Sequence, residues 1–278
     1  MKTVLLLSTY PIASPRHGGQ VRVANIAKTF GENGWSVTHL AVYEPEGYPP
    51  SSLGANDVSF PAGSPFRKYK GTYVPLINDL LSGEFAASEQ GGFADILKKL
   101  PPVIDVIHVE QPWLWPLVLK IRQMPQHANA CLIYGSQNIE APLKQEILDS
   151  YAIKGAEPVI ADIEALERKA ALEADIAVAV TQADYDILQA WGRRNHCLPP
   201  MESRLGRRSR SCSPAGKSVC RSLRGFSMLP APTRLISRAS MSASAVHWRA
   251  YRRIANWWWS AVCVSTLRQR CVTVAGDN

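Results

Sequence analysis

Acidic residues are nearly absent from the last third of the chain. Residues 195–278 hold 14 Lys and Arg but only 2 Asp and Glu, whereas residues 1–194 hold 17 Lys and Arg and 21 Asp and Glu. The two parts therefore carry formal charges of +12 and −4, which sum to the +8 of the whole chain. Cysteine is scarce in the first part, where Cys131 stands alone, and the other five cysteines follow it. We predict one domain over residues 1–194 and an Arg- and Ser-rich tail over residues 195–278.

Long apolar runs are also missing. No run reaches the roughly 18–20 residues that a membrane-spanning helix needs. The opening MKTVLLLSTYP has a short apolar run with no small-residue cleavage site after it, which does not fit a secretory signal peptide. We therefore expect a cytoplasmic protein. In that reducing compartment the six cysteines are not expected to form a set of disulfides.

The first 194 residues alternate between strand and helix patterns. Lys2–Ser8 is a continuous apolar run, which is typical of a strand buried on both faces of a parallel sheet. The segment VRVANIAKTFGENG, residues 21–34, predicts a helix that ends near Gly34. The order strand, loop, helix, strand predicts an α/β fold with a Rossmann-like, doubly wound parallel sheet. Residues 44–75 are predicted as loop. Further strands are expected at 35–43, 104–110, 130–134 and 174–180, and further helices at 93–100, at 159–172 and after Thr181.

The loop after the first strand is the first candidate site. It ends in Gly18 and Gly19, whose backbone N–H groups can approach a phosphate, and the next helix adds its positive end. A flexible turn explains the two glycines equally well. No G-x-G-x-x-G follows the strand. Although Glu44 lies near the place of the acidic residue, the loop 9–19 is too long for a nicotinamide-dependent oxidoreductase.

Four segments in this order resemble the N-terminal domain of GT-B glycosyltransferases of the family-4 type. STYPIASPRHGGQVRVANIAKTFGENGWSVTHLAVY resembles the family's opening, with Trp35 in place of the usual His. IDVIHVEQP is similar to its "DVVH" strand end. GSQNIE resembles its "HN-x-E" segment, with Gln137 in place of His. ALERKAALEADIAVAVTQADYDIL resembles its "E…AD…avS..D" segment, with Thr181 in place of Ser. The resemblance covers residues 1–190.

The resemblance implies an enzyme of two Rossmann-like domains that transfers a sugar with retention, without a bound metal or cofactor. Its partners would be a nucleotide-sugar donor and a carbohydrate or lipid-linked acceptor, with peripheral membrane contact allowed and no specific nucleic acid. The N-terminal domain shapes the acceptor site, and protein donors meet the leaving-group charge. By this resemblance, Gly18 and Gly19 border the donor phosphates. His108 or Glu110 faces the reacting sugar as the catalytic group. The acceptor side is lined by Arg16, His17, Asn138 and Glu140.

Simpler interpretations of these residues stay open. A His at a strand end, such as His108, is often a structural residue. Glu140 can simply start a helix, where a carboxylate suits the helix dipole. Arg16 and His17 can be solvated loop residues.

The tail does not continue the strand and helix pattern that a second domain requires. One hypothesis is a frameshift near residue 195. Trp has one codon, so Trp257–Trp259 fix TGGTGGTGG, and the frame one base earlier gives Leu-Val-Val, a strand-like run. The same offset allows "PNGV" at 200–203, which resembles the family's entry into its second domain. The donor-binding domain would then be missing and this chain inactive. The alternative is a Rossmann-like binding module whose basic tail binds nucleic acid or anionic membrane.

Overall fold

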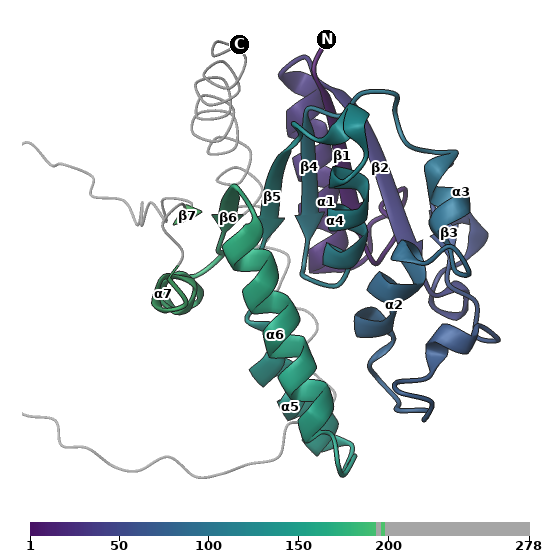
Figure 1. Cartoon of the computed structure of the whole chain (residues 1–278), viewed down its shortest axis with the longest axis vertical. Helices are drawn as coiled ribbons and strands as arrows, with labels where there is room; N and C mark the ends of the chain where they lie inside the picture. The colour runs from purple at the N-terminus through teal and green to yellow at the C-terminus, as the bar shows by residue number, and fades with distance from the viewer. Residues whose placement is uncertain (193–195, 198–278) are drawn as a thin grey trace, which may run out of the picture. The chain divides into compact units, whose positions relative to one another are not determined.

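The computed structural model describes residues 1–192 and 196–197 (Figure 1). Within them, one parallel sheet has the strand order β3-β2-β1-β4-β5-β6-β7. The sheet confirms the predicted α/β, doubly wound fold. Apart from residues 196–197, the predicted tail at 195–278 lies outside the described residues. The strands are β1 (Thr3–Ser8), β2 (Ser36–Tyr43), β3 (Val58–Ser59), β4 (Val106–Glu110), β5 (Cys131–Gly135), β6 (Ile176–Val178) and β7 (His196–Cys197).

The central strand β1 shows why its apolar run is unbroken. Val4 and Leu6 point to one face of the sheet and pack against helix α1 (Gly18–Glu32). Leu5 and Leu7 point to the other face and join the larger core. All four side chains are fully buried. The register Val4↔Val106 and Val4↔Val37 places β1 between two parallel neighbours, so neither the edges nor the faces of the strand meet water from Val4 to Leu7.

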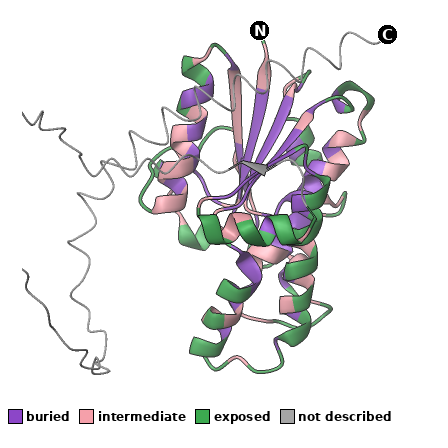
Figure 2. Ribbon diagram, turned by 90° about the vertical axis from the view of Figure 1, so that its left-hand side faces the viewer, coloured by how far each residue is buried: buried purple, intermediate pink, exposed green. Residues whose placement is uncertain are grey.

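Helices cover both faces of the sheet. Helix α1 packs on one face through Val23, Ile26 and Phe30. On the other face the core receives side chains from α2 (Asn78–Ala87), α4 (Trp115–Arg122) and α6 (Glu157–Glu173). Buried strands lie between helices whose outer faces are exposed (Figure 2). The remaining α-helices are α3 (Phe93–Leu97), α5 (Glu140–Ser150) and α7 (Gln182–Ala190).

The predicted elements differ from the observed ones in places. Residues 44–75, predicted as loop, contain β3 and three short 3-10 helices, η1 (Pro45–Gly47), η2 (Pro50–Ser52) and η3 (Pro65–Arg67). Helices α2 and α4 were not predicted. Helix α4 begins with Trp115-Pro116, and proline in the first turn is a recognisable start signal. A fourth short 3-10 helix, η4, spans Pro125–His127.

The sheet order determines where a ligand can bind. The chain leaves β1 toward β2 and β3 on one side, and β4 to β7 extend from the other side. In such sheets the ligand-binding crevice lies beyond the carboxyl ends of the two neighbouring strands at which the strand order reverses, and here these strands are β1 and β4. The loops after β1, β4 and β5 reach this edge. Among the described residues, no helix combines the length and the apolar character needed to cross a bilayer.

Candidate functional site at the carboxyl edge of the sheet

Helix α1 begins at Gly18, one turn earlier than the sequence predicts. His17 is its N-cap, and the His17 Nδ1 accepts a hydrogen bond from the Gln20 backbone N–H at 3.4 Å. Gln20 completes the capping box, because its Oε1 accepts from the backbone N–H groups of His17 and Arg16, the latter at 2.7 Å. Gly18 and Gly19 therefore belong to the first helical turn and not to the loop. No acidic residue lies in that turn.

Gly19 packs closely against the ends of two side chains. A Cβ at this position would lie 2.8 Å from the Tyr10 hydroxyl and 3.0 Å from Gln137 Oε1. The Tyr10 ring also stacks edge-on against His17, with ring centroids 5.1 Å apart. The missing side chain thus lets α1 approach the loops after β1 and β5. A role of Gly18 and Gly19 beside donor phosphates stays a prediction.

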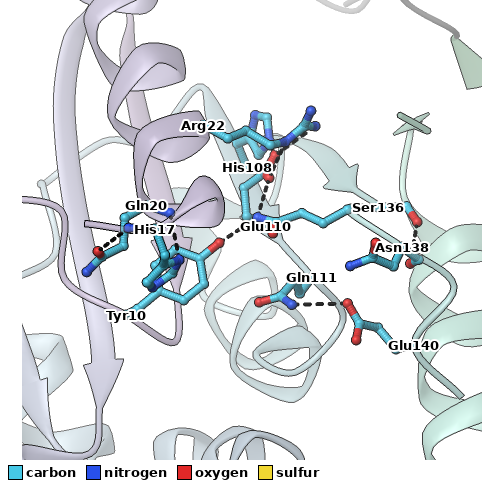
Figure 3. Close-up of polar contacts among 11 residues, drawn as sticks. Tyr10, His17, Gln20, Arg22, His108, Glu110, Gln111, Ser136, Asn138 and Glu140 are labelled. Atoms are coloured by element: carbon cyan, nitrogen blue, oxygen red, sulfur yellow. Dashed lines mark hydrogen bonds and ion pairs between the residues drawn. The ribbon is translucent and has the colours of Figure 1, made fainter. Parts of the chain in front are cut away.

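Glu110, buried at the end of β4, is the centre of a polar cluster (Figure 3). Its Oε2 lies 2.7 Å from Arg22 Nε and accepts a hydrogen bond from Gln137 Nε2 at 3.0 Å. Its Oε1 lies 2.8 Å from His108 Nε2. Gln137 also donates to the Tyr10 hydroxyl. Glu110, His108, Arg22, Gln137 and Tyr10 are called the Glu110 cluster below.

The partners of Glu110 keep it ionised. Burial alone would raise its pKa, but the charge of Arg22 and the hydrogen bond from His108 lower the pKa to about 2. The Glu110 side chain is completely buried, as is that of His108. Both predicted catalytic residues thus face protein partners, so direct contact with a sugar would require the cluster to open.

Gly135, at the end of β5, makes room for this carboxylate. It pairs with Glu110 across the sheet, and a Cβ on Gly135 would lie 2.0 Å from Glu110 Oε1. A glycine is therefore needed where the two strands meet the cluster. The sequence segment GSQNIE begins with Gly135, so packing against Glu110 explains the glycine of this segment.

Glu140 lies in a second buried acidic site. It begins α5, as the simpler interpretation of the sequence predicts, and only 3% of the residue is exposed. Its Oε1 accepts a hydrogen bond from Gln111 Nε2 at 3.0 Å, and its backbone N–H donates to Glu167 Oε2 at 2.8 Å. Glu167 of α6 also accepts from the Tyr134 hydroxyl at 3.0 Å, so a carboxylate from one helix meets the start of another.

Burial dominates the titration of these two carboxyl groups. It raises the pKa of Glu140 to about 7 and that of Glu167 to about 8. Asn138, by contrast, is exposed, and its backbone carbonyl accepts from Ser136 Oγ at 2.9 Å. Of the residues predicted to line the acceptor side, Asn138 is therefore accessible and Glu140 is buried.

An open cavity lies beside the loop after β1. It has a volume of about 360 Å³, within the range of small-molecule sites. Arg16 and His17 line one side, and residues after β2 line the other. The lining includes Ser14, Arg16, His17, Glu44, Tyr48 and Ser52, and the space is called the Arg16 cavity below. The predicted acceptor residues Arg16 and His17 thus lie together at one cavity.

Sequence reasoning missed Tyr10, Arg22 and Tyr48. Arg22 and Glu110 are 88 residues apart, and no local pattern indicates that they pair. Gln20 carried only half of a signal, because a capping box has Glu or Gln at this position but normally Ser or Thr three residues earlier, where this chain has His17. Tyr48 lies in the stretch predicted as loop, where its single aromatic ring carried no periodicity.

No protein-family model matches the chain, and no curated protein sequence matches it. Two solved structures are similar in fold, both titled sucrose-phosphate synthase from Thermosynechococcus elongatus. One has 12% identity and a TM-score of 0.47, and the match covers 72% of this chain and 48% of that chain. The other has 14% identity and a TM-score of 0.43, and the match covers 73% of this chain and 91% of that chain. This chain thus spans about half the length of the first, and TM-scores below 0.5 carry no conclusion about function.

Proposed function

We propose that this chain is the acceptor-side domain of a retaining GT-B glycosyltransferase, which transfers a sugar from a nucleotide-sugar to a glycan or lipid-linked saccharide. The proposal rests first on the four family-like segments in the first 190 residues. It also fits the doubly wound sheet, which this family shares with many other proteins. The sheet alone does not distinguish a transferase from another α/β protein.

The observation that carries the proposal is the place where three of these segments meet. The segment with Gly18 and Gly19, the end of β4 at Glu110 and the segment after β5 at Gln137 contact one another at the carboxyl edge of the sheet. This edge is the ligand-binding edge of open parallel sheets. An open cavity with Arg16 and His17 adjoins it.

Within this proposal, Glu110 and His108 act as positioning residues. Glu110 ties α1, through Arg22, to the loop after β5, through Gln137. A fixed start of α1 would then hold Gly18 and Gly19 toward a donor diphosphate across the cleft. Asn138 would remain available to the acceptor, whereas Glu140 would act through Gln111.

The proposal includes the frameshift near residue 195 and the loss of the donor-binding domain. We expect the purified chain to bind no UDP- or GDP-sugar more tightly than roughly 10 μM, about −7 kcal/mol. Calorimetry with a panel of these donors measures this. A chain whose gene is corrected by one base near codon 195 is the matched comparison, and it should bind a donor and transfer its sugar. Tight donor binding by the uncorrected chain would contradict the loss, and a corrected gene without an extended reading frame would contradict the frameshift.

A further inference from the structure

The Arg16 cavity carries hydrogen-bond donors that the protein itself does not use. The Arg16 guanidinium makes no hydrogen bond or ion pair with any other described residue, although its backbone N–H binds Gln20. Arg16 keeps a full positive charge at any physiological pH. An unpaired guanidinium at a cavity wall is suited to a carboxylate or a phosphate, which it can bind through two N–H groups.

His17 adds a donor with a fixed tautomer. Its Nδ1 accepts the Gln20 backbone N–H, so the neutral ring carries its proton on Nε2. Partial burial lowers the pKa of His17, which favours this neutral form. The ring thus offers one N–H group to an acceptor atom.

The acidic residue of the lining, Glu44, already has protein partners. Glu44 Oε2 accepts hydrogen bonds from Arg67 Nη1 and Asn78 Nδ2, both at 2.8 Å. Arg67 is largely buried, and it also pairs with Glu46 Oε2 at 3.3 Å. Glu44 thus has protein partners, whereas the Arg16 guanidinium of the same lining has none among the described residues.

Tyr48 provides an apolar wall. The residue is half-buried and packs edge-on against Tyr43, with ring centroids 6.3 Å apart, which holds it in place. Pro49 lies beside it in the lining. A fixed aromatic ring next to polar groups suits a sugar, because one face of a sugar ring is apolar while its edge carries hydroxyl groups.

We propose that the Arg16 cavity binds an anionic monosaccharide unit, with its carboxylate or phosphate on Arg16 and His17 and its ring against Tyr48. This inference rests on the proposed function for its biological meaning, since it makes the acceptor an acidic saccharide. The binding itself needs only the described residues. It is therefore measurable without a donor-binding domain.

The test is a chemical-shift titration of the ¹⁵N-labelled chain with glucuronate, glucose 6-phosphate, glucose and inorganic phosphate. At least one of the two anionic sugars should bind roughly tenfold or more tightly than glucose, the gain expected for a charged hydrogen bond. The tighter of the two identifies the acidic group as carboxylate or phosphate. Inorganic phosphate should bind more weakly than the sugar that carries it.

Matched variants locate the site. Arg16→Gln should reduce the affinity for the anionic sugar to that for glucose, roughly tenfold. Arg168→Gln, an exposed change of the same charge on α6, should leave it unaltered. Tyr48→Ala should weaken the binding of both charged and neutral sugars. Thermal unfolding and the amide spectrum check that each variant is folded.

Four results would overturn the inference. Glucose could bind as tightly as both anionic sugars, inorganic phosphate could match glucose 6-phosphate, or Arg168→Gln could weaken binding as much as Arg16→Gln. Absence of any saccharide binding would overturn it as well. The proposed function is judged separately, by donor binding and transfer in the frame-corrected protein, so the two failures are distinguishable.

Discussion

Two polar regions lie side by side at the carboxyl edge of the sheet, and they differ in how many of their polar side chains have hydrogen-bond or ion-pair partners. In the Glu110 cluster, both carboxylate oxygens have protein partners and the side chain is fully buried. At the Arg16 cavity, a guanidinium and a ring N–H line open space of about 360 Å³. Polar groups that are buried and paired hold elements together, whereas unpaired donors at a cavity remain available for a ligand.

This difference changes how the sequence motifs are understood. The predicted catalytic residues, His108 and Glu110, lie in the closed region. Arg16 and Tyr48 lie in the open region, and no family motif singles out Tyr48. The segments that carry the resemblance meet at one edge of the sheet, and burial and pairing decide which side chains are accessible to a ligand there.

The largest expected effect is on the closed region. Glu110→Ala would leave Arg22 and Gln137 without their carboxylate partner in the interior, and we expect a loss of about 3–5 kcal/mol in the free energy of unfolding. Urea denaturation followed by circular dichroism measures it.

An exposed ion pair of equal length provides the control. Lys98 and Asp95 are also 2.7 Å apart, but their side chains are 73% and 65% exposed. Asp95→Ala should leave the free energy of unfolding almost unchanged, because an exposed ion pair contributes little to stability. Equal losses for the two variants would show that the Glu110 cluster does not hold the edge together.

A smaller effect concerns pH and the buried carboxyl groups of Glu140 and Glu167. Their folded-state pKa values, about 7 and about 8, lie above those of unfolded carboxyl groups, so the folded state binds more protons. Their contribution to stability is present at low pH and is lost as pH rises through the folded-state values. Between pH 7 and 9 the free energy of unfolding should fall by about 2 kcal/mol.

Variants on one helix test this pH dependence. Glu167→Gln should remove most of the fall in the free energy of unfolding between pH 7 and 9, since an amide does not titrate. Glu164→Gln, an exposed change on the same helix α6, should keep it. A fall that persists in Glu167→Gln would mean that other groups cause the pH dependence.

The smallest expected effect compares two glycines of α1. Gly19→Ala places a Cβ against the Tyr10 hydroxyl and Gln137, and should destabilise the protein by about 1 kcal/mol. Gly31→Ala meets no atom within 4 Å and should stabilise it by about 0.5–1 kcal/mol. Thermal unfolding gives both values. The same sign for both changes would show that Gly19 is not a packing position.

Local patterns predicted much of the fold and less of the site. The unbroken apolar run at Val4–Leu7 indicated a central parallel strand, and the alternation of elements indicated the sheet. The site depends on contacts between distant residues, such as Arg22 with Glu110, which no periodicity records. Helix α1 began earlier than predicted because a histidine served as its N-cap, and histidine is not among the favoured capping residues.

The most direct test of the contrast between the two regions measures saccharide binding and stability in the same two variants, Arg16→Gln and Glu110→Gln. Arg16→Gln should lose the preference for the anionic sugar while its free energy of unfolding stays within about 0.5 kcal/mol of the parent. Glu110→Gln should lose stability, because the charge partner of Arg22 is removed, while its folded fraction binds the anionic sugar as the parent does. If Glu110→Gln instead abolishes binding in a fully folded protein and Arg16→Gln leaves it unchanged, the closed region is the binding site and the account is wrong.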